Sequence, residues 1–150
     1  MFTPKILKME RYKPDVTVLD HTADIGIIVR GHNIKNLFKT AALAMMQLMI
    51  TNKSAQPSSS IHISIKSTDP ADLMVRWLGE ILYLFHGEKA VVIHSEIHFI
   101  SPTHLEATLG TARFNPDLHE VLCEIKAVTF HQIEVMEKDD CWEAKVIFDV

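Results

Sequence analysis

Residues 20–24, which read DHTAD, place two carboxylates and an imidazole within five positions. They lie between two β-branched runs, residues 16–19 and 25–30, which predict two strands joined by a polar turn. Such side chains at a strand junction can coordinate a hard cation or act as an acid–base pair. Asp and Thr side chains also hydrogen-bond the backbone of turns, so a purely structural role is the alternative. The motif alone leaves both interpretations open.

A second acidic feature lies at the carboxyl end of the chain. The strand-like residues 142–148 are followed directly by Asp149 and Val150. If this strand is ordered to its end, the Asp149 side chain and the α-carboxylate of Val150 concentrate negative charge at one point. Such a point calls for a cation, a lysine or an arginine nearby. A solvated chain end is the structural alternative.

Nine histidines invite a transition-metal interpretation. His94, Glu96 and His98 alternate and would share one face of a strand. However, the chain has neither an HExxH motif nor the Cys/His spacing of zinc sites, and these side chains equally suit a solvated strand face. It also lacks a Walker A loop, a GxGxxG turn and a GxSxG motif. We therefore expect no transition metal, phosphate-binding loop or catalytic triad.

The composition indicates one globular domain, because 150 residues with 47% hydrophobic content can bury a substantial core. A net charge of -4 disfavours direct nucleic-acid binding, since proteins that grip phosphates usually present a basic patch. The two cysteines, Cys123 and Cys141, have no paired spacing. With no secretory leader and no membrane-spanning run, we expect a soluble cytoplasmic protein with reduced thiols and no membrane partner.

The chain predicts two helices. Apolar residues at three- and four-residue spacing predict an amphipathic helix from residue 34 to 49, with Asn33 as its N-cap. Asp69 and Pro70 predict the start of a second helix, and Gly87 its end. The second helix is apolar around most of its circumference, so we expect it to be covered on two sides. Gly79 interrupts it, and we expect a closely packed neighbour there.

The remaining segments predict strands. Residues 61–66 alternate apolar and polar side chains, as in a half-buried strand. Four further strands are expected near residues 90–100, 104–113, 121–135 and 142–148, joined as antiparallel neighbours. The predicted order is ββαβα followed by about four strands. This order indicates an α+β fold with the helices packed between or against strand layers.

Five segments, in this order and covering nearly the whole chain from about residue 15, resemble the archease family: DHTADIGI at 20–27, LFKTAALAMMQLM at 37–49, DPADLMVRWLGEILYLF at 69–85, EIKAVTFH at 124–131 and WEAKVIFDV at 142–150. The resemblance implies a three-layer strand/helix/strand fold. It also implies an archease domain over residues 15–150, which leaves residues 1–14 as a flexible N-terminal extension.

The resemblance further implies a non-catalytic accessory protein. Archeases assist RtcB-type RNA ligases in tRNA splicing, promoting their GTP-dependent guanylylation and their multiple turnover. A chaperone-like role towards other tRNA-processing enzymes, such as tRNA methyltransferases, is the second role associated with the family.

The family's divalent metal site, usually described as calcium, carries over to Asp24 and Asp149, with a backbone or terminal oxygen from Val150. Lys126 matches a position linked to activity that does not bind the metal. Asp20 and His21 are expected beside the ligands without binding the ion directly. Two carboxylates and one further oxygen leave a calcium coordination sphere of ~6–8 oxygens incomplete, so water or a partner must complete it.

Three other interpretations follow from the residues alone. A small carboxylate-metal hydrolase would use Asp20, His21 and Asp24 and would turn over a phosphoester by itself. An interaction module would carry the acidic cluster incidentally. A ferredoxin-like RNA-binding domain is disfavoured, because the strands show no exposed aromatic pair with basic neighbours.

Overall fold

The computed structural model describes residues 5–7, 15–20, 24–52 and 56–150. In chain order the elements are β1 (Lys5–Leu7), β2 (Val16–Asp20), β3 (Asp24–Gly31), α1 (Ile34–Met49), β4 (Ile50–Asn52), β5 (Ser59–Lys66), α2 (Pro70–Glu88), β6 (Ala90–Ser101), β7 (His104–Arg113), β8 (His119–Val121), β9 (Ala127–Val128), β10 (Glu134–Lys138) and β11 (Cys141–Asp149). In these ranges no helix is both long and apolar enough to cross a membrane.

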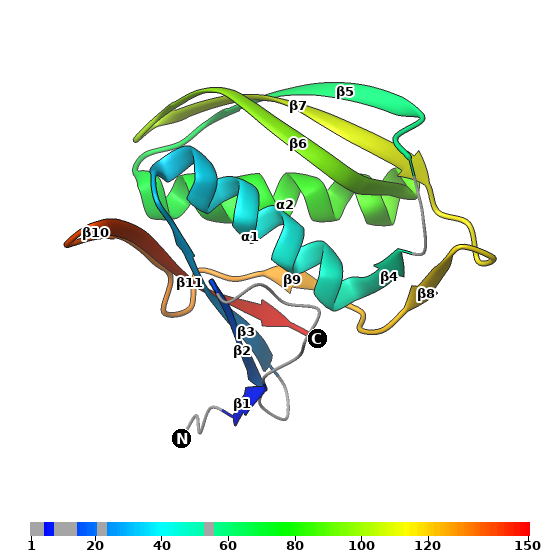
Figure 1. The fold of residues 1–150 in the computed structure, drawn as a ribbon, viewed down its shortest axis with the longest axis horizontal. Coiled ribbons are helices and arrows are strands. Elements are labelled where there is room, and N and C mark those ends of the chain that lie inside the picture. The colour runs from blue at the N-terminus through cyan, green and yellow to red at the C-terminus, as the bar shows by residue number, and fades with distance from the viewer. Residues whose placement is uncertain (1–4, 8–14, 21–23, 53–55) are drawn as a thin grey trace.

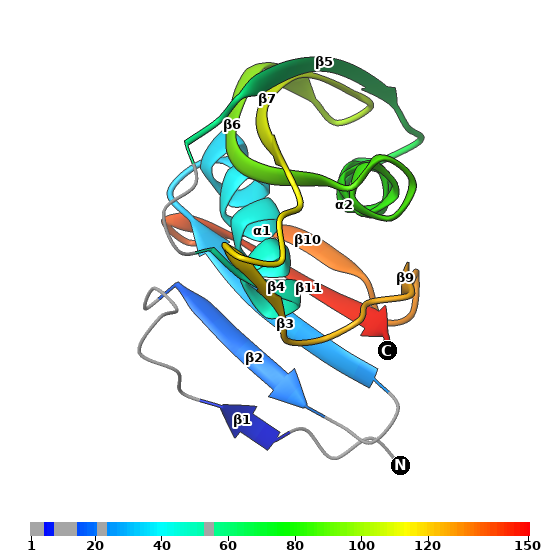
Figure 2. The same ribbon diagram turned by 90° about the vertical axis from the view of Figure 1, so that its right-hand side faces the viewer.

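Two antiparallel sheets enclose the two helices. One sheet has the strand order β1-β2-β3-β11-β10, with β9 pairing the end of β11, and the other has the order β5-β7-β6. A short ribbon of β4 and β8 completes the structure. Figure 1 shows α1 and α2 between the two sheets, and Figure 2 shows the same layers from the side. The expected α+β fold with strand/helix/strand layers is confirmed.

The second helix is buried on several sides, as its apolar circumference predicts. Leu73, Met74, Trp77 and Leu78 have no exposed surface. The Trp77 indole nitrogen donates a hydrogen bond of 2.9 Å to the Phe38 carbonyl of α1, so the helices are joined by a polar contact inside the apolar layer. Because a buried indole N–H needs a partner, this bond also fixes the orientation of the ring.

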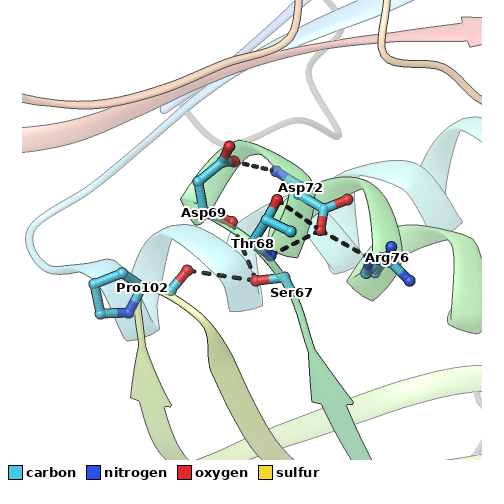
Figure 3. Close-up of polar contacts among 6 residues, drawn as sticks. All are labelled: Ser67, Thr68, Asp69, Asp72, Arg76 and Pro102. Carbon is cyan, nitrogen blue, oxygen red and sulfur yellow. Dashed lines mark hydrogen bonds and ion pairs between the residues drawn. The ribbon is translucent and has the colours of Figure 1, made fainter.

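The start of α2 is held by the predicted cap. The Asp69 carboxylate accepts the backbone N–H of Asp72 at 2.8 Å, and the Asp72 carboxylate accepts the backbone N–H of Thr68 at 3.0 Å (Figure 3). Arg76 adds an ion pair of 2.9 Å to Asp72, one turn along the helix. The Thr68 hydrogen bond and then Arg76 lower the pKa of Asp72. The first helix has the predicted cap as well, since Asn33 accepts from a backbone N–H at 2.8 Å.

The second helix does not end at Gly87. It continues to Glu88, and Lys89 adopts the left-handed conformation, with φ 56° and ψ 31°. The Lys89 N–H then bonds back to the carbonyl of Phe85 at 3.0 Å. Glycine favours this conformation, but the free-energy difference for one residue is only about 1–2 kcal/mol. The Lys89 carbonyl also accepts a hydrogen bond of 2.8 Å from the Phe114 N–H, which ties the turn to the end of β7.

The strand prediction after α2 was wrong in two respects. Residues 121–135 do not form one strand but contribute to three short ones, β8, β9 and β10, separated by irregular connections. Two of the expected antiparallel neighbours are confirmed, since β6 pairs with β7 and β10 pairs with β11. The four strands do not form one series, because β7 also pairs with β5 and β11 also pairs with β3. Hairpin signals report only neighbours in sequence, so they could not reveal these two further pairings.

The N-terminal residues contribute to the larger sheet. Lys5–Leu7 form β1, which pairs with β2 at the sheet edge, from Lys5 opposite Asp20 to Leu7 opposite Val18. The predicted extension over residues 1–14 did not include this strand. Residues 1–4 and 8–14 lie outside the described residues, so their expected flexibility stays a prediction.

The close packing expected at Gly79 is also absent. A Cβ atom added there would meet no heavy atom within 4 Å. Glycine inside a helix is less favourable than alanine by roughly 0.5–1 kcal/mol. We therefore expect Gly79→Ala to raise the free energy of unfolding by about that amount, measured by urea denaturation. A decrease would show that a contact not seen here requires glycine.

Gly31→Ala is the control for this substitution, because Gly31, unlike Gly79, has a close backbone neighbour. Its added Cβ would lie 2.5 Å from the backbone nitrogen of Leu37, a contact that flexible side chains cannot relieve. We expect this substitution to lower the free energy of unfolding by about 1–3 kcal/mol, the usual range for overpacking.

Candidate functional site

Two carboxylates from opposite ends of the chain meet at one edge of the larger sheet. Asp24 is the first residue of β3 and Asp149 is the last residue of β11. The antiparallel register places them directly opposite each other. Residues opposite each other project from the same face, with Cβ atoms roughly 4.5–5.5 Å apart. The two residues that the family resemblance assigns to the metal site are therefore neighbours.

Lys126 is hydrogen-bonded through its backbone to the strand end that carries Asp149. Its N–H donates a hydrogen bond of 2.8 Å to the Asp149 carbonyl, immediately before β9 pairs with β11. Its neighbour Ile125 is fully buried, and the Ile125 carbonyl accepts a hydrogen bond of 2.7 Å from the His86 ring. These contacts fix the chain on both sides of Lys126, whose side chain is exposed.

Val150 follows Asp149 and packs partly against the core. Because side chains alternate along an extended chain, the Val150 side chain points away from the Asp149 carboxylate. Its apolar contact holds the end of the chain beside the carboxylate pair. This position agrees with an oxygen donor from Val150, although the donor role stays a prediction.

Asp20 lies at the same end of the sheet but on the other face. It pairs with Ile25, and Ile25 alternates with Asp24 along β3. Burial raises the pKa of the Cys123 thiol, and the negative charges of Asp20 and Glu124 raise it further. His21 lies outside the described residues. The expectation that Asp20 and His21 support the metal ligands stays a prediction.

The donor set suits a hard cation better than a transition metal. In the described ranges no group of three His, Cys, Asp or Glu side chains is arranged to hold any metal ion, so the Asp24–Asp149 pair would need further oxygens from the backbone, water or a partner. Neither Asp24 nor Asp149 forms an ion pair with another described residue. Like charges directly opposite on paired strands destabilise a sheet unless a cation lies between them. The two carboxylates supply oxygen, the ligand type that calcium prefers.

A different polar cluster occupies the outer face of the smaller sheet. The Glu106 carboxylate contacts the rings of His62 and His104 at 3.1 and 2.7 Å. The sequence analysis considered a different set, His94, Glu96 and His98, and disfavoured it as a metal site; these side chains are exposed on β6. Only the pairing of β7 with β5 shows that Glu106 lies between two histidines.

This cluster predicts a pH-dependent stability. Hydrogen bonds from Ser64, His104 and His62 lower the pKa of Glu106 to about 2. The carboxylate therefore stabilises the fold above its unfolded pKa of about 4.3, and this contribution declines as the pH falls towards 2. We expect the difference in unfolding free energy between wild type and Glu106→Gln to be largest near pH 6 and to shrink between pH ~4.3 and ~2. A difference that is constant with pH in urea titrations would contradict this assignment.

The protein is an α+β protein with three layers, in which the helices lie between two sheets. Two carboxylates lie opposite each other where β3 begins and β11 ends. The profile of the Archease protein family (MTH1598/TM1083) matches residues 17–150. Proteins named archease from Methanosarcina barkeri and Methanosarcina acetivorans are 34% and 32% identical over 137 and 136 residues, in each case 88% of this chain and 93% of that protein. The chain belongs to the archease family.

Solved structures agree with this assignment. The solution structure of protein 1598 from Methanobacterium thermoautotrophicum is 30% identical, with a TM-score of 0.77, and the match covers 91% of this chain and 99% of that one. An archease from Thermotoga maritima, described as a possible chaperone, matches with a TM-score of 0.63 at 20% identity over 95% of this chain and 100% of that one. At that identity the second likeness supports the fold alone.

Proposed function

We propose that this protein is a non-catalytic accessory factor that activates an RtcB-type RNA ligase in tRNA splicing. It promotes the GTP-dependent guanylylation of the ligase and its multiple turnover. Membership of the archease family supports the accessory role. The observation that carries the proposal is the register that sets Asp24 opposite Asp149, with Lys126 bonded to the same strand end.

In this proposal the carboxylates of Asp24 and Asp149 hold a divalent cation, calcium, with an oxygen of Val150. A bound calcium ion would supply positive charge and free coordination positions at the sheet edge. Val150 and the Lys126 backbone keep the strand end in place. The exposed Lys126 side chain is free to contact an anionic group of the partner. The direct partner is an enzyme in the cytoplasm, and neither RNA nor a membrane.

Two alternatives make different predictions. The first is a chaperone-like modulator of another tRNA-processing enzyme, such as a tRNA methyltransferase, which the family resemblance also implies. A carboxylate-metal hydrolase would need Asp20, His21 and Asp24 to converge. The register opposes this convergence, because Asp20 and Asp24 project from opposite faces of the sheet.

The test is RNA ligation by the RtcB-type ligase of the same organism, with the RNA substrate in excess. GTP and divalent metal are supplied, and the protein is present or absent. We expect more turnovers per ligase and faster formation of the ligase–guanylate when it is present. Phosphoester turnover by the isolated protein would favour the hydrolase. Stimulation of a tRNA methyltransferase without any effect on the ligase would favour the chaperone-like role.

A further inference from the structure

Residues 117–124, here called the 117–124 segment, expose apolar and acidic side chains together. Its large apolar side chains are between 38% and 54% exposed: Leu118, Val121 and Leu122. Its acidic side chains are exposed as well: Asp117, Glu120 and Glu124. No lysine or arginine occurs from residue 114 to 125. Exposed apolar side chains on a surface often mark an interaction site, and the charged side chains within residues 114–125 are all acidic.

The backbone holds this segment in place. The N–H groups of Leu122 and Cys123 both point to the Met49 carbonyl, at 2.8 and 3.3 Å. The Glu120 N–H donates to the Thr51 hydroxyl at 3.1 Å, and β8 pairs with β4 through this region. The apolar side chains are therefore presented by a hydrogen-bonded ribbon, which lowers the entropy lost when a partner binds.

The segment continues directly into the carboxylate site. Leu122 and Lys126 are four residues apart, so their Cα atoms lie within about 14 Å of each other even if the chain is fully extended. Figures 1 and 2 show the chain running from β8 to β9 and reaching the C-terminal end of β11. A standard interface buries about 800 Å² per partner, a circle of roughly 16 Å radius. One interface of ordinary size can therefore include both features.

We propose that the 117–124 segment is a docking surface for a basic face of a protein partner. The matching surface on the partner is an apolar depression bordered by lysine and arginine side chains. Enzymes that bind RNA carry such basic side chains to attract phosphates. Val121 and Leu122 are the apolar anchors, and Glu120 and Glu124 form the charged rim. The inference rests on the proposed function, because it places the partner's surface across both this segment and the Asp24–Asp149 pair.

The test measures the dissociation constant for the RtcB-type ligase at several salt concentrations. The double variant Val121→Thr with Leu122→Gln removes the apolar anchors and keeps a strand-compatible residue in β8. We expect it to weaken binding at least about tenfold at 0.15 M salt, as for buried anchors in other interfaces. The double variant Glu120→Lys with Glu124→Lys is expected to weaken binding most at low salt, because salt screens the rim charges.

Two matched controls separate local from general effects. Glu134→Lys with Glu137→Lys makes the same change in net charge on exposed positions of β10. Tyr83→Gln removes an apolar side chain that is 64% exposed on α2. We expect both controls to bind within about twofold of wild type. Circular dichroism spectra and thermal unfolding check that all variants fold.

The outcomes are distinguishable. If wild type binds and activates the ligase but the Val121/Leu122 variant binds equally well, the docking surface is wrong and the proposed function stands. If wild type neither binds nor activates the ligase, both proposals fail. If the same variant changes only self-association in sedimentation velocity, the segment is an interface between copies of this chain and the proposal is overturned.

Discussion

Asp149→Asn is expected to remove most of the stimulation of the ligase, by at least about tenfold in turnovers per unit time. The substitution keeps the size of the side chain but removes one of two carboxylate charges that the register sets opposite each other. A hard cation bound by two carboxylates loses much of its binding energy when either carboxylate charge is removed. Asp24→Asn is expected to have the same effect, and multiple-turnover ligation measures both.

The same variants have a second readout that does not depend on the ligase. In the presence of a chelator, Asp149→Asn is expected to raise the free energy of unfolding by about 0.2–1 kcal/mol, because a like-charge cross-strand pair is removed. Calcium at 100 times its dissociation constant should stabilise wild type by about 2.7 kcal/mol and should not stabilise the variant. Asp140→Asn, on an exposed turn between β10 and β11, is the control and should behave as wild type in both assays.

The metal assignment fails if calcium leaves the thermal unfolding of wild type unchanged and if Asp24→Asn and Asp149→Asn activate the ligase normally. A variant that binds calcium normally but does not activate would instead place these carboxylates in contact with the ligase. These two results separate the metal site from the accessory role.

Trp77→Ala is expected to have the largest effect on stability. The ring is fully buried between the two sheets, and its nitrogen is bonded to the Phe38 carbonyl of α1. Removing a buried tryptophan typically lowers the free energy of unfolding by about 3–5 kcal/mol, against a total of about 5–15 kcal/mol for a domain. We therefore expect a large fall in the urea midpoint of unfolding.

Trp77→Phe separates the packing of the ring from its hydrogen bond. It keeps much of the apolar contact and loses the bond to Phe38, which is worth about 1 kcal/mol, so its effect should be clearly smaller. Tyr83→Ala, on the exposed side of the same helix, should change stability little. If Trp77→Ala unfolds within about 1 kcal/mol of wild type, the helices are not held together by this side chain.

The local elements were predictable because their signals lie within a few residues. Asn33 and Asp69 cap the helices as predicted, since a cap needs only its own side chain and an N–H three residues along. The end of the second helix was not predictable, because Lys89 and not Gly87 adopts the left-handed conformation, and the Lys89 carbonyl accepts a hydrogen bond from the distant Phe114 N–H. The free-energy cost of a glycine inside the helix could be stated for Gly79 from the sequence. The open space around Gly79 could not.

For the candidate site, the sequence by itself determined the residue types: carboxylates at Asp24 and Asp149, a lysine at 126 and an apolar residue at the chain end. The family resemblance assigned those residues to one site, while the residues alone left the question open. The tertiary structure decided that β3 and β11 pair in the register that makes the two carboxylates neighbours. It likewise decided that Glu106 lies between two histidines. Pairing between distant strands depends on the packing of the whole chain, so no local pattern could reveal it.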